Sequence, residues 1–138
     1  MEWMLMPLRR YADFQGRSRR KEYWMFFLLL IVVYSVFMVP LMLSGAAASM
    51  AGQQTPGPLF FVGFGLIVIL ALALFIPSIA VQVRRFHDQN RSGWMVLIGL
   101  IPYVGGLILL VFMCLEGTRG PNRFGPDPKD PAHQDVFA

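Results

Sequence analysis

Residues 84–94, RRFHDQNRSGW, form a polar stretch between two long apolar runs. If a helix continues through it, four charged or titratable side chains share one face at spacings i, i+3, i+4 and i+7, namely Arg84, His87, Asp88 and Arg91. A histidine beside an aspartate can carry a proton near neutral pH, and arginine forks match phosphate oxygens. The spacing therefore points to acid–base chemistry or to recognition of an anion.

The same stretch has a simpler interpretation, as the turn between two membrane helices. Arg84 and Asp88 would pair along the helix, and Ser92 would cap the helix that follows. His87 is the residue that this interpretation does not require.

Two other polar segments offer similar chemistry. Residues 14–24, FQGRSRRKEYW, carry several arginines, and Glu22 within them could hold Arg85 or Arg91 by an ion pair. Residues 117–128, GTRGPNRFGPDP, have the glycines and prolines of a defined turn that packs back on the protein. Together the three segments supply the candidate anion- or partner-binding residues: Arg17, Arg19, Arg20, Arg84, Arg85, His87, Asp88, Arg91, Asn122 and Arg123.

No catalytic motif, metal site or cofactor site is predicted. A zinc site needs a cluster of ligands, whereas His87 and His133 lie far apart and Cys114 lies in an apolar run. The net charge of +4 does not favour nucleic acid, because the arginines lie at the ends of apolar runs, where anionic lipid headgroups are the nearer partner.

Three apolar runs must position these segments: residues 23–43, 59–83 and 93–115. Of all residues 56% are hydrophobic and only 14% charged, and no charged residue occurs between positions 23 and 83. Because about 20 apolar residues cross a bilayer and must satisfy their own backbone as a helix, the pattern predicts an all-α polytopic membrane protein with about three transmembrane helices. The first run exceeds the apolar core of a cleaved signal peptide, so we expect it to be retained as an anchor.

The third run is interrupted by Pro102 and by Gly105-Gly106. A single kinked crossing is the simpler interpretation and the one we favour. The alternative is a re-entrant hairpin, which would return the chain to the side from which it came, although each arm would be too short to cross and would have to be buried in protein or line a wet cavity.

Charge asymmetry predicts the orientation. All 12 lysines and arginines lie outside the apolar runs, and the 44–58 loop has none. By the positive-inside rule, the N-terminus and the 84–92 loop are cytoplasmic and the 44–58 loop is outside. We expect one integral-membrane domain over residues 1–128 and a flexible tail over 129–138.

The chain resembles a bacterial inner-membrane family of unknown function, number 805, in three segments separated by apolar runs: FQGRSRRKEYW, RRFHDQNRSGW and GTRGPNRFGPDP. The resemblance covers about residues 8–128. Phe86 is the one departure at a motif position, where leucine is more familiar, and the 44–58 loop has no match. The resemblance implies a small multi-span protein of the bacterial inner membrane with no established activity.

Three functional hypotheses follow. We favour a non-enzymatic accessory or binding protein whose basic cytoplasmic face contacts anionic lipid headgroups or a membrane partner, a second copy of the chain included. The alternative is an enzyme acting on a phosphorylated or lipid-linked substrate, with His87 as acid and base. In the third hypothesis, an accessory to envelope assembly or stress, the helices matter and the polar segments do not.

Overall fold

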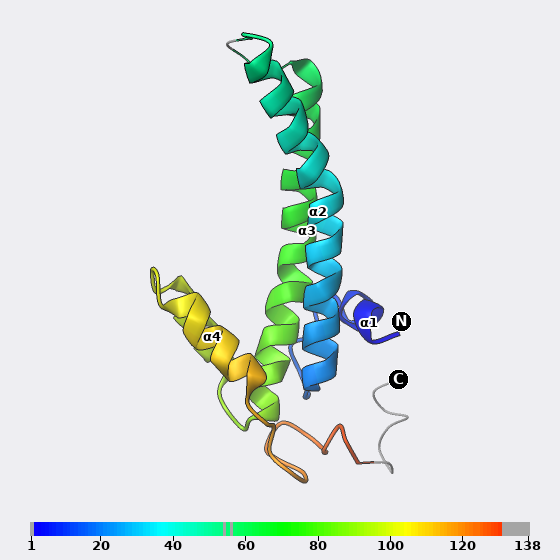
Figure 1. Ribbon diagram of the computed structural model, residues 1–138. Helices are drawn as coiled ribbons and strands as arrows, with labels where there is room; N and C mark the ends of the chain where they lie inside the picture. Colours follow the sequence, from blue (N-terminus) through cyan, green and yellow to red (C-terminus); the bar gives the residue numbers. More distant parts are fainter. Residues whose placement is uncertain (1, 54, 56, 131–138) are drawn as a thin grey trace. The chain divides into compact units, whose positions relative to one another are not determined.

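Five helices account for most of the chain in the computed structural model, which describes residues 2–53, 55 and 57–130. They are α1 (Glu2–Arg9), α2 (Arg20–Met50), α3 (Pro58–Asp88), the 3₁₀ helix η1 (Gly93–Leu100) and α4 (Gly105–Cys114) (Figure 1). Over the described residues the only β pairing is an isolated bridge between Asn122 and Gly125. The predicted all-α class is confirmed. Residues 131–138, which include His133 and most of the predicted tail, lie outside the described part.

The chain divides into two compact units. Residues 1–26 and 76–138 form one, called the motif unit here because it holds all three polar segments. Residues 27–75 form the other, the apolar unit. Each unit is described by itself.

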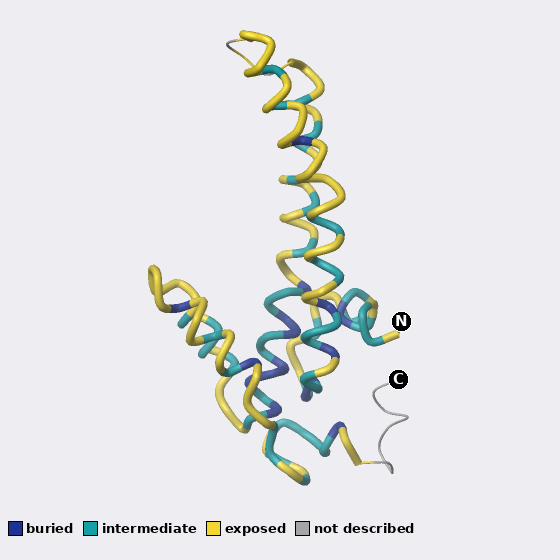
Figure 2. Tube along the Cα trace, in the orientation of Figure 1, coloured by how far each residue is buried: buried dark blue, intermediate teal, exposed yellow. Residues whose placement is uncertain are grey.

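The apolar unit consists of two helical segments side by side, from α2 and α3 (Figure 1). Most of its side chains are exposed, among them Val36 at 62% and Leu72 at 68% (Figure 2). Small residues allow the segments to approach closely, since a Cβ at Gly63 would lie 3.2 Å from Leu41 Cδ1. An apolar surface of this extent is typical of contact with lipid.

Helices α2 and α3 are long and apolar enough to cross a membrane. Each has 31 residues, which corresponds to about 46 Å against about 30 Å of hydrocarbon. The predicted runs 23–43 and 59–83 therefore fit within the helices, and the polar helix ends, residues 20–22 and 84–88, lie outside these runs.

The third apolar run is a hairpin of η1 and α4 (Figure 1). Between the two arms Tyr103 adopts φ 66°, and the return passes so close that a Cβ at Gly105 would lie 2.2 Å from the Ile98 carbonyl oxygen. The arms have 8 and 10 residues, or roughly 15 Å each, so neither spans the hydrocarbon. The chain therefore doubles back within residues 93–115 and does not form the single kinked helix that we favoured, and this path fits the re-entrant alternative.

The hairpin starts as the sequence predicted. Ser92 caps η1, and its hydroxyl oxygen accepts a hydrogen bond from the Trp94 backbone N–H at 3.4 Å. Helix α3 ends at Asp88, and Asn90 then turns the chain with φ 56°. The helix thus stops before Arg91, so the predicted shared face ends at Asp88.

Candidate functional site

The three polar segments meet in a buried cluster of charges within the motif unit. Arg17 comes from the first segment and Arg84 and Arg85 from the last turns of α3, and all three side chains are at most 1% exposed. Glu22 and Asp88 are buried with them. Buried charges are stable in a protein only when partners and hydrogen bonds compensate them, so the pairing of this cluster decides what it can do.

Asp88 is the centre of the cluster. Its Oδ1 accepts a hydrogen bond from Arg17 Nε at 3.0 Å and lies 2.9 Å from Arg17 Nη2. Its Oδ2 accepts from Arg85 Nη1. Burial raises the pKa of Asp88, and the guanidiniums of Arg85 and Arg17 oppose that shift. One carboxylate thus compensates two buried cations.

Arg84 has a different partner from the predicted one. Its Nη2 lies 3.2 Å from Glu22 Oε1, so it pairs with α2 and not with Asp88. The expected pairing of Arg84 with Asp88 is wrong, as is that of Glu22 with Arg85 or Arg91. The reason is geometric: Arg85, three residues before Asp88, pairs with it along α3, and Arg84 is directed to the neighbouring helix.

The third segment closes the cluster with backbone carbonyls. Arg17 donates to the carbonyl oxygens of Gly120, at 2.6 Å, and of Thr118. Arg85 donates to the Leu115 carbonyl, and the Thr118 backbone N–H donates to the Asp88 carbonyl at 2.8 Å. The chain passes so near that a Cβ at Gly117 would lie 1.9 Å from Asp88 Oδ2. Arg17 and Arg85 therefore hold the three segments together.

His87 faces away from the charge cluster. Its Nδ1 lies 3.2 Å from the Gly16 carbonyl oxygen, and its ring stacks on Phe124 with centroids 3.9 Å apart. Burial lowers the pKa of His87, as does the charge of Arg123, while the hydrogen bond to Gly16 raises it. The predicted His87–Asp88 pair does not form, because Asp88 is directed to the arginines and His87 to Phe124.

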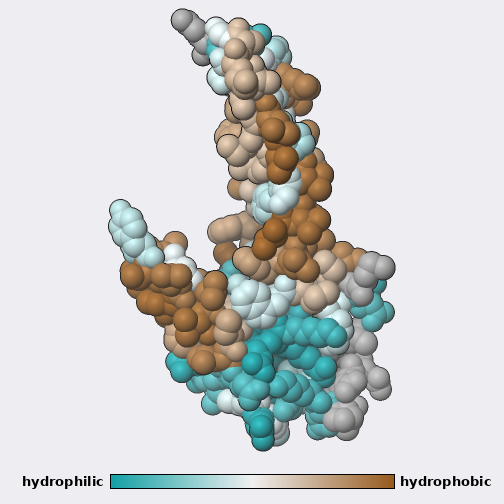
Figure 3. Space-filling view, in the orientation of Figure 1, coloured by the Kyte–Doolittle hydropathy of each residue, from teal (hydrophilic) through white to brown (hydrophobic). Residues whose placement is uncertain are grey.

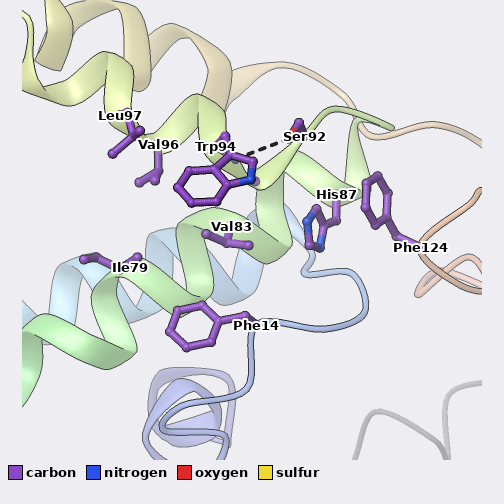
Figure 4. Close-up of a pocket in the computed structure, with 10 residues that line it drawn as sticks. Phe14, Ile79, Val83, His87, Ser92, Trp94, Val96, Leu97 and Phe124 are labelled. Carbon is purple, nitrogen blue, oxygen red and sulfur yellow. Dashed lines mark hydrogen bonds between the residues drawn. The ribbon is translucent and has the colours of Figure 1, made fainter.

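A pocket of about 650 Å³ lies beside His87 (Figure 4). Phe14, Phe124, Ser92 and side chains of α3 and η1 surround it, and the lining is apolar except for His87 and Ser92. Figure 3 shows that hydrophilic residues gather over much of the motif unit, while the η1–α4 hairpin presents a hydrophobic surface. The pocket thus lies where an apolar and a polar part of the same unit meet.

Comparison with known proteins agrees with the resemblance. One family profile, described as Protein of unknown function (DUF805), matches residues 11–126. The chain belongs to this family. It is 46% identical to inner membrane protein YhaH of Escherichia coli K12 over 94% of this chain and 98% of that protein, and 41% identical to inner membrane protein YhaI of the same strain over 94% and 97%. No solved structure matches.

The matched region of this DUF805 chain contains the whole charge cluster, from Arg17 to Gly120. Both relatives are named inner membrane proteins, and this chain has two helices that are long and apolar enough to cross a membrane. The chain is therefore an integral protein of the bacterial inner membrane. The names of these two relatives state a location and no activity.

The remaining predicted residues of the DUF805 chain lie nearer the surface. Arg20 pairs with Glu116. Asn122 donates to the His87 carbonyl at 2.9 Å and is thereby part of the scaffold. Arg91 and Arg123 are exposed, and each guanidinium lies over a phenylalanine ring, at 4.8 Å from the Phe112 centroid and 4.7 Å from the Phe124 centroid. Arg19 lies 5.3 Å from the Trp3 ring centroid.

Sequence reasoning did not identify several partners of these residues. The carbonyls of Leu115, Thr118 and Gly120 complete the cluster, and a backbone carbonyl has no signature in the sequence. Gly117, the first residue of GTRG, was a possible signal, because a residue without a side chain can approach Asp88 closely. Within the described residues no three His, Cys, Asp or Glu side chains gather as metal ligands would.

Proposed function

We propose that this chain is a multi-pass, non-enzymatic binding protein whose exposed cytoplasmic arginines and lysines contact anionic lipid headgroups. One observation carries the proposal: exposed or half-exposed cations of the motif unit lie over aromatic rings. Arg19 and Lys21 flank Trp3, with Lys21 Nζ 5.7 Å from the ring centroid. Tryptophan beside basic side chains is typical of the headgroup layer of a membrane.

Burial separates the candidate arginines into two groups. Arg17 and Arg85 use their guanidiniums within the protein and have no free face for an anion. Arg19, Arg91 and Arg123 keep their guanidiniums near the surface, as Lys21 does its ammonium group. We therefore assign headgroup contact to the second group and a structural role to the first.

The enzymatic alternative has less support. The Gly16 carbonyl orients the His87 ring but, unlike a carboxylate, carries no charge that would stabilise the protonated ring. The carboxylate of Asp88 is occupied by Arg17 and Arg85.

The proposal includes an orientation. The positive-inside rule gives a cytoplasmic N-terminus, and two crossings by α2 and α3 followed by a hairpin return the tail to the same side. A reporter fused after residue 138 should therefore behave as cytoplasmic: green fluorescent protein should fluoresce and alkaline phosphatase should be inactive. The opposite pattern would contradict the orientation and favour a third crossing by residues 93–115.

Lipid selection tests the binding role. The protein is reconstituted in equal amounts of dioleoylphosphatidylglycerol and dioleoylphosphatidylcholine, re-extracted in mild detergent, and its retained lipids are quantified by mass spectrometry. We expect retention of the anionic lipid to exceed that of the neutral one. The double variant Arg19→Gln/Lys21→Gln should weaken anionic lipid binding by roughly thirtyfold, since each basic residue near a membrane surface contributes about 1 kcal/mol.

The matched control is Arg119→Gln/Lys129→Gln, which removes the same charge from two exposed residues outside the Trp3 site. It should weaken binding by less than about threefold, as expected for charges that act only through the screened surface potential. Equal retention of the two lipids by the unmodified protein would refute the binding role.

A further inference from the structure

The pocket beside His87 follows one face of α3. Ile79, Val83 and His87 line it at spacings i, i+4 and i+8, so successive residues are about 6 Å apart along the helix axis. Ile79 and Val83 fall in the last part of the predicted span 59–83, and His87 lies one turn beyond it. The pocket therefore runs from the edge of the hydrocarbon to the level of the headgroups.

The opposite wall is apolar and comes from η1. Trp94, Val96 and Leu97 face the α3 residues across the pocket, and Phe14 closes one side (Figure 4). The volume of about 650 Å³ lies within the roughly 300–1,000 Å³ of most small-molecule sites. Because the lining is apolar and continuous with exposed apolar side chains of the hairpin, such as Leu97, a hydrocarbon chain can enter it from the bilayer.

The polar end of the pocket is an acceptor. The Gly16 carbonyl can only accept, so His87 Nδ1 carries the proton and donates to it. In the neutral ring, which burial favours, Nε2 then presents a lone pair. Gly93 leaves the space in front of it open, since a Cβ there would lie 3.1 Å from Nε2 and 2.7 Å from Val83 Cγ1. The geometry suits a hydroxyl donor from a ligand.

A positive charge lies close to this end. The Arg123 guanidinium packs on Phe124, whose ring stacks on His87, and Arg123 is exposed. Its Nη2 donates to the Asn90 carbonyl at 3.2 Å, which leaves other donors for an anion. A hydroxyl acceptor, a cation and an apolar channel thus lie near one another, and each is complementary to one part of a phospholipid.

We propose that this pocket binds a single acyl chain of an anionic phospholipid, with a headgroup hydroxyl on His87 Nε2 and the phosphate on Arg123. This inference rests on the proposed lipid-binding function and adds a defined site to it. The occupant is a lipid because the pocket opens among side chains that face lipid, and it is anionic because of Arg123.

Native mass spectrometry of delipidated protein, titrated with dioleoylphosphatidylglycerol in detergent, measures the site. We expect one lipid to bind more tightly than the rest. Val96→Trp fills the pocket from η1 and should weaken that one lipid by at least tenfold. Leu100→Trp, the same kind of change on the same helix at a residue that is 78% exposed and outside the pocket, should leave it unchanged.

Ile79→Phe fills the pocket from the opposite wall. It tests the site independently if Val96→Trp does not fold. Thermal unfolding midpoints close to that of the unmodified protein show that each variant is folded. Loss of the tight lipid in both pocket variants and its retention in Leu100→Trp support the site. Retention in folded forms of both overturns it, as does a second copy of the chain bound in place of the lipid.

A separate experiment tests the hydroxyl contact. Dioleoylphosphatidylmethanol has the charge and chains of phosphatidylglycerol but no headgroup hydroxyl, so the unmodified protein should prefer phosphatidylglycerol by roughly fivefold, the value of one hydrogen bond. His87→Phe keeps a ring for Phe124 to stack on and should remove the preference. A preference that survives this change overturns the contact with Nε2.

The two proposals fail differently. The Arg19→Gln/Lys21→Gln variant should lose weakly bound anionic lipid and keep the tight one. If it loses lipid as expected while the pocket variants lose none, the lipid-binding function stands and the pocket site falls. If the unmodified protein binds phosphatidylglycerol and phosphatidylcholine equally, both fall.

Discussion

Asp88→Asn is expected to lower the free energy of unfolding by about 3–5 kcal/mol, the usual effect of removing one partner from a buried ion pair. The asparagine is nearly the same size but carries no charge, so Arg17 and Arg85 would remain buried without a counter-ion. Because a domain of ordinary stability has about 5–15 kcal/mol in total, the loss is a large share. Urea unfolding of the protein in detergent, followed by tryptophan fluorescence, measures it.

Asp13→Asn is the matched control. Asp13 also pairs with an arginine, Arg10 at 2.6 Å, but its side chain is 39% exposed. Exposed ion pairs contribute about 0–1 kcal/mol, so this variant should remain near the unmodified protein. Similar effects of the two substitutions would show that the Asp88 cluster does not hold the motif unit together.

The contrast between the two aspartates illustrates what the sequence could predict. Each is an acid near arginines, and nothing in the local pattern indicates which of the two is buried in an ion pair. The difference comes from the carbonyls of Leu115 and Gly120, which approach from about 30 and 100 residues away along the chain and exclude water from Arg85 and Arg17. Long-range approach of a backbone leaves no periodic signal.

The apolar runs were predictable for the opposite reason. Lipid contact requires a continuous apolar run of fixed length, so the composition of residues 23–43 and 59–83 was sufficient to predict helices there. The polar segments were also found, and their resemblance to one family was correct. What remained open was whether the third segment could join the other two, and that depended on the path of the chain after Gly93.

Local signals in the third run fit both a kink and a hairpin. Pro102 interrupts a helix in either case. Contacts distant in sequence accompany the return of the chain: Arg85 donates to the Leu115 carbonyl, and the Gln89 side chain donates to the Phe112 carbonyl. Arg85 lies in the last turn of α3 and Gln89 directly follows it, and the two donors tie the end of α4 to the start of the polar loop. A hydropathy pattern contains no information on such contacts.

Gly105→Ala is the second large effect that we expect. The new methyl group would lie 2.2 Å from the Ile98 carbonyl oxygen and 3.1 Å from the Gly99 carbonyl carbon, both of them backbone atoms. Because a backbone cannot move aside as a flexible side chain does, the hairpin must open. This should lower the free energy of unfolding by about 3 kcal/mol, the upper part of the usual range for overpacking. The unfolding midpoint in detergent should fall accordingly.

Gly106→Ala distinguishes this clash from a general effect of alanine. The two glycines are neighbours in the first turn of α4, and no atom lies within 4 Å of a Cβ at Gly106. Alanine is the better helix former by about 1 kcal/mol, so this variant should be unchanged or slightly more stable. If the two variants unfold alike, the arms of the hairpin are not in contact at Gly105, and a straight third crossing becomes the better description of residues 93–115.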